Sequence, residues 1–249
     1  QFDRIHHKRI DADVRRLRRS PGAFFALMTR TQPYLHHILD AVTEANLPTE
    51  LALLPAIESG FRPHAYSPDG ASGLWQFMPA TGRMMGLQQD WWFDRRRALR
   101  ASTTAAIAYL KALNARFDGD WLHTLAAYNA GATKVKRAIR LATRRGEKTD
   151  FWSLDLPGET DAYVPRLFAL ARVVRDPEAY GVSRTTLYRW FEREGDMTKA
   201  AWKAFMNIGY GKTAQSPLEA RELAMFRDGV DSWIMNRDRL LKAVANRLQ

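Results

Sequence analysis

The chain has 249 residues, 46% of them hydrophobic, which is enough for one or two domains with a buried core. It has no cysteine, which excludes disulfides, thiolate metal sites and a cysteine nucleophile, and no apolar run of about 18 residues that could span a membrane. The net charge of +11 favours a polyanionic partner or an anionic surface: nucleic acid, an anionic cell-wall polymer or membrane headgroups.

The first elements are basic and helical. Residues 3–19 carry apolar positions at loose helical spacing, so we expect a surface helix or arm, followed by a Pro-Gly break and a short apolar patch. Together, residues 1–30 are predicted to form an N-terminal basic helical arm. A helix is then predicted from Thr31-Gln-Pro33 to about Ala45, because proline is favoured in the first turn. Because the sequence begins with Gln1, we expect a processed chain from which any targeting segment is absent.

The next predicted helix ends in a carboxylate. Leu51, Leu54 and Glu58 have the spacing i, i+3 and i+7 and share one face, which we expect to turn inward. Pro55 should kink this helix, because it cannot donate a hydrogen bond to residue 51. A carboxylate at the rim of an apolar face loses hydration, so its pKa should rise, which suits a general acid. A glutamate near a helix end can also be solvated or pair with a nearby cation such as Arg62.

The rest of the chain is predicted to be helical as well. Residues 60–74, rich in Gly and Pro, are read as a loop. The further predicted helices run from Pro79 to about Gly86, Asp94 to about Phe117, Trp121 to Ala130, Lys134 to about Thr143, and Glu159 to about Val174. Within the long helix, we expect Ala105, Ala106, Ala108, Tyr109 and Leu113 to pack inside. No stretch alternates apolar and polar residues for long enough to indicate a sheet, so the fold class is all-α.

Three motifs occur in order: Glu58-Ser59, Gly73-Leu-Trp-Gln76 and Ala127-Tyr-Asn-Ala-Gly131. With them, the chain resembles the lytic transglycosylases that have a lysozyme-like fold, and most closely their membrane-bound type D branch. The resemblance extends from about residue 20 to about 181 and includes Glu159-Thr160 with Tyr163-Val-Pro. It implies a catalytic domain similar to goose-type lysozyme and soluble lytic transglycosylases at residues 31–181, with a helical C-terminal extension of unassigned role at 182–249.

The resemblance implies that Glu58 is the single catalytic acid and base. It also implies that six residues bind the substrate or line its cleft: Ser67, Gln76, Tyr128, Asn129, Glu159 and Tyr163. Structural roles stay open for several of them. Gln76 could satisfy buried backbone groups, Gly73 could serve loop geometry alone, and Tyr128 could be a core aromatic residue with a paired hydroxyl.

Most glycosidases use two carboxylates. Near Glu58 the candidates for a second are Asp69 and Asp94, which both read as turn residues. The resemblance instead implies that Glu58 protonates the glycosidic oxygen and that the 6-hydroxyl of N-acetylmuramic acid then attacks C1. The implied enzyme is a peptidoglycan lytic transglycosylase that cleaves the β-1,4 bond between N-acetylmuramic acid and N-acetylglucosamine and leaves 1,6-anhydro ends. A hydrolytic muramidase of the same fold is the alternative.

The implied partners are peptidoglycan glycan strands, with no cofactor, no metal and no nucleic acid. Adjacent histidines, as in His6-His7 and His36-His37, would point about 100° apart in a helix and are read as surface residues. We expect a monomer at the periplasmic face of the cell envelope. Any association with the outer membrane would use a segment outside this sequence.

Two other functions compete with the enzyme. Residues 181–189 resemble the turn and recognition helix of helix-turn-helix proteins, which with the basic charge indicates DNA binding. A short Ser-capped basic helix is also common, and residues 163–180 already match the last helix of the transglycosylase family. A catalytically inactive wall-binding scaffold is the third interpretation, against which the presence of Glu58 argues.

Overall fold

The computed structural model describes residues 2, 5–177 and 179–180. Over these ranges the chain is helical, and its only β contacts are isolated bridges such as Tyr66–Ser72 and Gln89–Asp94. The all-α prediction is therefore confirmed for this part of the chain. The predicted extension at 182–249 and the helix-turn-helix-like segment at 181–189 lie outside the described residues.

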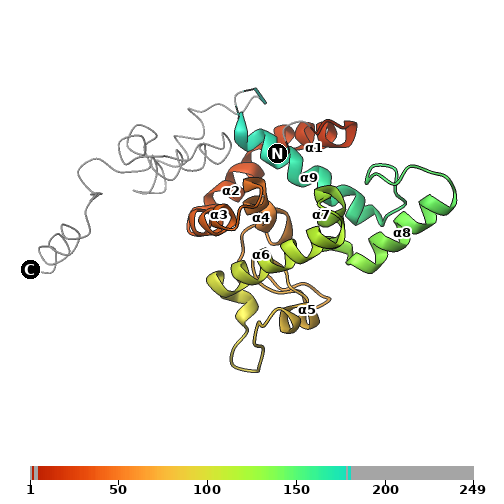
Figure 1. Cartoon of the computed structure of the whole chain (residues 1–249). Helices are drawn as coiled ribbons and strands as arrows, with labels where there is room; N and C mark the ends of the chain where they lie inside the picture. The colour runs from red at the N-terminus through yellow and green to blue at the C-terminus, as the bar shows by residue number, and fades with distance from the viewer. Residues whose placement is uncertain (1, 3–4, 178, 181–249) are drawn as a thin grey trace, which may run out of the picture.

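Figure 1 shows the helices of the described chain. Their bounds are α1 Lys8–Arg19, α2 Pro21–Thr31, α3 Leu35–Glu44, the 3-10 helix η1 Thr49–Leu53, α4 Leu54–Glu58, α5 Pro79–Met84, the 3-10 helix η2 Arg95–Arg97, α6 Leu99–Arg116, α7 Trp121–Ala130, α8 Ala132–Arg144 and α9 Gly158–Arg175.

The N-terminal helices pack on the body of the molecule. In α1, Ile10 and Val14 are buried against α9, and the Arg172 guanidinium donates to the Asp11 carboxylate at 2.9 Å. The apolar patch after the Pro-Gly break is a helix of its own, α2, which buries Phe24, among others, in the same core. Helix α1 of the basic arm thus packs against α9 (Figure 1). That the arm is a separate unit stays a prediction.

The segment that leads to Glu58 is not the single kinked helix that the sequence predicted. It consists of η1 followed by α4, and Pro55 lies in the first turn of α4. A proline in the first turn lacks only an N–H that would have had no helical partner, so it starts a helix there instead of bending one. Leu51 and Leu54 are fully buried, as expected for the inward face.

The long helix predicted from Asp94 begins later than expected. Asp94 caps η2, and α6 begins at Leu99. Ala108 is exposed, contrary to the prediction, and Leu110 takes the buried position on that turn. The bounds of α7 agree with the sequence, because the Asp120 side chain accepts a hydrogen bond from the His123 N–H at 2.9 Å and caps the helix start.

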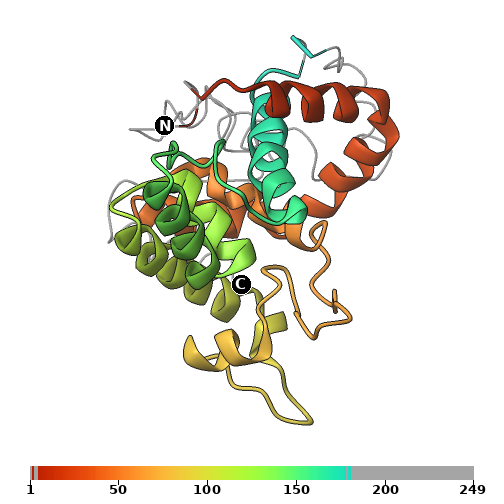
Figure 2. The same cartoon turned by 90° about the vertical axis from the view of Figure 1, so that its right-hand side faces the viewer.

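Figure 2 shows two groups of helices with a connecting region between them. The groups are α6, α7 and α8 on one side and α1, α2 and α9 on the other. The loop between α5 and η2 projects away from both groups. Among the described residues, no helix combines the length and the apolar character needed to cross a bilayer.

Candidate active site

Glu58 is the last residue of α4, and its neighbour fixes that helix end. The Ser59 hydroxyl is buried and lies 2.9 Å from the Leu74 carbonyl oxygen and 3.1 Å from the Pro55 carbonyl oxygen. The Ser59 side chain therefore connects the C-terminal end of α4 to the segment that carries Gln76. These hydrogen bonds explain why a serine follows Glu58, because Ser59 fixes the backbone next to the carboxylate.

A cleft of about 400 Å³ opens beside Glu58. Its walls come from α4, the 65–79 loop, α5, α6, α7 and α9. All seven residues singled out from the sequence line it: Glu58, Ser67, Gln76, Tyr128, Asn129, Glu159 and Tyr163. The structure thus brings together side chains that are up to 105 residues apart in sequence.

The environment of Glu58 favours its protonated form. Burial raises the pKa of Glu58 to about 7, and the nearby Glu159 charge acts in the same direction. The Tyr163 hydroxyl donates to Glu58 Oε1 at 2.5 Å, which stabilises the carboxylate and partly opposes that rise. Burial and the Glu58 charge raise the pKa of Tyr163 well above its ordinary value, so its hydroxyl keeps the proton that it donates.

The cleft face of α7 is fixed by two hydrogen bonds. The Tyr128 hydroxyl donates to the Trp75 carbonyl oxygen at 2.9 Å, and the Asn129 Oδ1 accepts from the Thr160 hydroxyl at 2.7 Å. Tyr128 therefore has the paired hydroxyl of a structural aromatic residue while its side chain also lines the cleft. The Asn129–Thr160 bond joins α7 to α9 across the site.

Ser67 and Gln76 brace the loop that carries them. Ser67 Oγ accepts from the Ala71 N–H at 2.9 Å, and Gln76 Nε2 donates to the Gly73 carbonyl oxygen at 2.7 Å. Gln76 itself has a positive φ of 49°, a strained conformation that these contacts help to hold. The backbone-satisfying role that the sequence left open for Gln76 is thus present, in a side chain that also lines the cleft.

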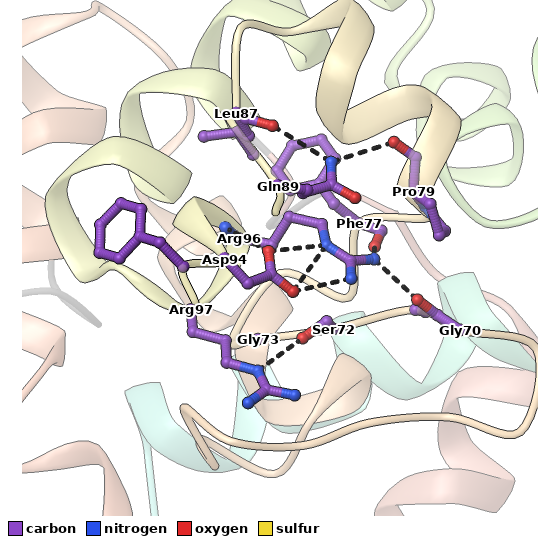
Figure 3. A network of polar contacts seen from close by, with 12 residues as sticks. Gly70, Ser72, Gly73, Phe77, Pro79, Leu87, Gln89, Asp94, Arg96 and Arg97 are labelled. Carbon is purple, nitrogen blue, oxygen red and sulfur yellow. Dashed lines mark hydrogen bonds and ion pairs between the residues drawn. The ribbon is translucent and has the colours of Figure 1, made fainter. Parts of the chain in front are cut away.

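A buried arginine holds the same loop in place (Figure 3). Arg96 is only 5% exposed, and its Nη1 donates to the carbonyl oxygens of Gly70 at 2.7 Å and Phe77 at 2.8 Å. Its Nη2 pairs with the Asp94 carboxylate at 2.8 Å. Burial alone would raise the pKa of Asp94, but the hydrogen bonds and charge of Arg96 outweigh it and hold that pKa below its usual value.

Of the two candidates for a second carboxylate, Asp69 and Asp94, only one lines the cleft. Asp94 is committed to Arg96 and does not line the cleft, so its role is structural. Asp69 does line the cleft, as does Glu159.

The cleft also contains Tyr109, which was predicted as an interior residue, and Arg166, which the sequence analysis did not single out. The spacing of Glu159, Tyr163 and Arg166 at i, i+4 and i+7 on one helix face could have identified the arginine.

The sequence profile of one family, described as the Transglycosylase SLT domain, matches residues 39–151. Over residues 39–151 the chain is therefore similar to the SLT transglycosylases. The resemblance seen in the motifs, and with it the lysozyme-like fold class, is thereby confirmed. The SLT domain includes Glu58, Ser67, Gln76, Tyr128 and Asn129, whereas Glu159 and Tyr163 follow it on α9.

Several curated proteins are similar to this chain. Membrane-bound lytic murein transglycosylase D of Escherichia coli (strain K12) is 49% identical over 157 residues, which cover 63% of this chain and 35% of that protein. A putative tributyltin chloride resistance protein of Alteromonas sp. (strain M-1) is 48% identical over 44% of this chain and 53% of its own length. Membrane-bound lytic murein transglycosylase F of Desulfosudis oleivorans is 34% identical over 38% of this chain and 21% of its own length. The matched part of the chain therefore spans about a third of the E. coli relative.

Proposed function

We propose that this chain is a peptidoglycan lytic transglycosylase in which Glu58 is the single general acid and base. The observation that carries the proposal is the half-buried Glu58 carboxyl, with its pKa raised to about 7, in a cleft within an SLT domain. A carboxyl group that keeps its proton near neutral pH can donate it to a leaving oxygen. The relatives named as lytic murein transglycosylases support the choice of murein as the substrate.

In the proposed reaction, protonated Glu58 gives its proton to the glycosidic oxygen as the bond to C1 breaks. The resulting Glu58 carboxylate then takes the proton of the muramic acid 6-hydroxyl as that oxygen bonds to C1. An internal hydroxyl benefits from a high effective molarity, so no activated water is needed. Tyr163 stabilises the carboxylate stage through its hydrogen bond to Oε1, and Gln76, Tyr128, Asn129, Ser67 and Glu159 bind or orient the sugar.

A hydrolytic muramidase remains the second candidate, because Asp69 lines the same cleft and could activate a water molecule. Mass spectrometry of the products released from purified sacculi separates the two reactions. Anhydro ends are lighter than hydrolysed ends by one water. Anhydro products that persist at the parent rate in Asp69→Asn would support the transglycosylase, whereas reducing ends that disappear in this variant would support the muramidase.

The pH dependence of cleavage should report the pKa of Glu58. The proton donor exists below that pKa and is lost above it, so kcat/KM on glycan strands is expected to fall as pH rises through about 7. The decline should approach about tenfold per pH unit on the alkaline side, as for loss of one essential proton. A rate that stays level well above this pH, measured with constant ionic strength, would contradict the assignment of Glu58 as the acid.

Tyr163→Phe should change both the rate and this pH profile. The hydroxyl stabilises the charged form of Glu58, so its removal should raise the pKa of Glu58 further and move the alkaline limb to higher pH. We expect kcat to fall by about tenfold, because the carboxylate stage loses a charge-assisted hydrogen bond. Tyr34→Phe is the matched control, because Tyr34 packs against the core and does not line the cleft. It should change neither kcat nor the position of the alkaline limb. An alkaline limb that does not move would remove Tyr163 from the mechanism.

We further propose that the chain acts as a monomer at the periplasmic face of the cell envelope. The E. coli relative is named as membrane-bound, which supports a location at the envelope, and the +11 net charge fits an anionic polymer there. Salt-dependent binding to duplex DNA with no release of muropeptides from sacculi would instead favour the nucleic-acid function read from residues 181–189.

A further inference from the structure

Three consecutive aromatic residues stand in solvent between α5 and η2. Trp91 is 84% exposed, Trp92 79% and Phe93 50%. We call these three residues the aromatic tip. Soluble proteins seldom leave several large aromatic side chains exposed together, and such a patch usually marks a binding surface. The loop that bears the tip projects away from the helices (Figure 2).

Several hydrogen bonds hold the backbone under the aromatic tip. Asp90 Oδ1 accepts from the N–H groups of Trp92 at 2.9 Å and Phe93 at 2.7 Å, and the Asp90 N–H donates to the Phe93 carbonyl oxygen at 2.8 Å. At the base, Gln89 Nε2 donates to the carbonyl oxygens of Pro79 and Leu87, both at 3.1 Å (Figure 3). The aromatic side chains are therefore displayed by a braced turn.

The surroundings of the tip are cationic. The exposed arginines nearest in sequence are Arg83, Arg95, Arg97 and Arg100. The Arg95 guanidinium lies 6.0 Å from the Phe93 ring centroid. The two acids of the loop are engaged locally, since Asp90 accepts from backbone N–H groups and Asp94 pairs with Arg96. The loop and its flanks thus combine exposed aromatic rings with an excess of basic over acidic side chains.

The aromatic tip is not part of the cleft. Among the described residues that line the Glu58 cleft, none belongs to the segment 82–108. The acceptor next to the tip, the Asp90 carboxylate, already accepts from the N–H groups of Trp92 and Phe93 and from Gln88 Nε2 at 3.4 Å, whereas sugar hydroxyls need free acceptors as well as donors. Trp91 and Trp92 also lie against each other, with ring centroids 4.2 Å apart, and so cover faces on which a sugar ring would stack. These observations favour a surface other than a glycan strand.

We infer that the aromatic tip docks this protein on the surface of an anionic phospholipid bilayer. Tryptophan is enriched at the headgroup level of membranes because its ring is apolar and its N–H is polar. Basic residues beside it are attracted to anionic headgroups, and the combination gives shallow, reversible binding in the interface. This contact uses the SLT domain itself and needs no segment beyond it. It is also independent of the cleavage reaction proposed above.

The test is co-sedimentation of the full chain with two kinds of vesicle, phosphatidylcholine alone and phosphatidylcholine mixed with phosphatidylglycerol. The parent chain should bind the mixed vesicles more tightly, and added salt should weaken that binding. The double variant Trp91→Ala/Trp92→Ala should bind them at least about tenfold more weakly, since it loses both interfacial rings. Because both side chains are exposed, its far-UV circular dichroism and its cleavage of solubilised glycan should equal those of the parent.

A pair of charge-matched variants separates the tip from the overall charge of the chain. Arg83→Gln/Arg95→Gln and Arg137→Gln/Arg140→Gln each remove two exposed positive charges, the first from positions that flank the tip in sequence and the second from α8. The first should weaken binding to the mixed vesicles by about tenfold, and the second much less. Equal losses in both, or unchanged binding after the tryptophan substitutions, would overturn the proposal. Retained vesicle binding with reduced binding to purified sacculi would overturn it in favour of a glycan contact.

Discussion

Glu58→Gln is expected to fold like the parent and to cleave peptidoglycan at least about 10²-fold more slowly, the lower end for removal of a general acid. Glutamine has the same shape and can still accept the Tyr163 hydrogen bond, but it has no proton to donate to a glycosidic oxygen. The measurement is the initial rate of muropeptide release from purified sacculi at a pH below 7, where the parent carboxyl is protonated.

The stability of the same variant provides an independent check. The pKa of Glu58 in the folded protein is raised above its ordinary value of 4.5 to about 7. Between these two values the unfolded chain ionises first, so the free energy of unfolding of the parent should fall as pH rises through this window. Glu58→Gln lacks this titration and should be more stable than the parent at pH 7 and above. A variant that is inactive and less stable at every pH would indicate a folding defect.

Glu44→Gln is the matched control for the chemical change. Glu44 is exposed at the end of α3 and does not line the cleft, so the same loss of a carboxylate there should leave the rate unchanged. Sacculi digested by Glu58→Gln at the parent rate would end the assignment of Glu58 as the acid, and with it the proposed mechanism.

The second large effect is expected from Gly73→Ala. Gly73 has a φ of +83°, and a Cβ atom there would lie 2.0 Å from the carbonyl oxygen of Arg96. Backbone must therefore move, either in the loop that carries Gln76 or in η2, which follows the capping residue Asp94. We expect a loss of at least about 3 kcal/mol in the free energy of unfolding, because a left-handed conformation that costs about 1–2 kcal/mol for a non-glycine residue is combined with a direct backbone clash.

Gly146→Ala separates these two contributions. Gly146 also has a positive φ, of +67°, but a Cβ there would meet nothing within 4 Å. Its substitution should cost only about 1 kcal/mol, from the backbone conformation alone. Chemical denaturation of both variants gives the comparison. Gly73→Ala should also lose cleavage activity under conditions where it remains folded, since Gln76 Nε2 donates to the Gly73 carbonyl oxygen. Equal losses of stability at the two glycines would show that the approach to Arg96 does not constrain the loop.

The sequence predicted the helices whose ends carry strong local signals. The bounds of α7 were found because Asp120 caps its start and Gly131 ends it. The segment before Glu58 was read as one kinked helix because periodicity does not distinguish a 3-10 turn from an α-helical one over five residues. The start of α6 was misplaced because Asp94 caps the short 3-10 helix η2, and α6 begins only after it, at Leu99.

The lining of the cleft was predicted through motifs, but its internal contacts were not. No local pattern states that Tyr163 donates to Glu58 across 105 residues, or that Thr160 holds Asn129. Arg96 is the clearest case. It stands in a run of three arginines that reads as exposed positive charge, yet it is buried because two carbonyl oxygens and one carboxylate satisfy its donors.

The position of α9 has a practical consequence for anyone who trims this protein. The match to the family profile stops at residue 151, yet the hydroxyl that touches Glu58 belongs to α9, and α1 packs against that same helix. A fragment that ends at residue 151 would lack α9, so the apolar surface that α9 covers would be exposed and Glu58 would lose its hydrogen bond from Tyr163. The smallest portion worth expressing therefore runs from α1 to the end of α9, well outside the limits of the family profile.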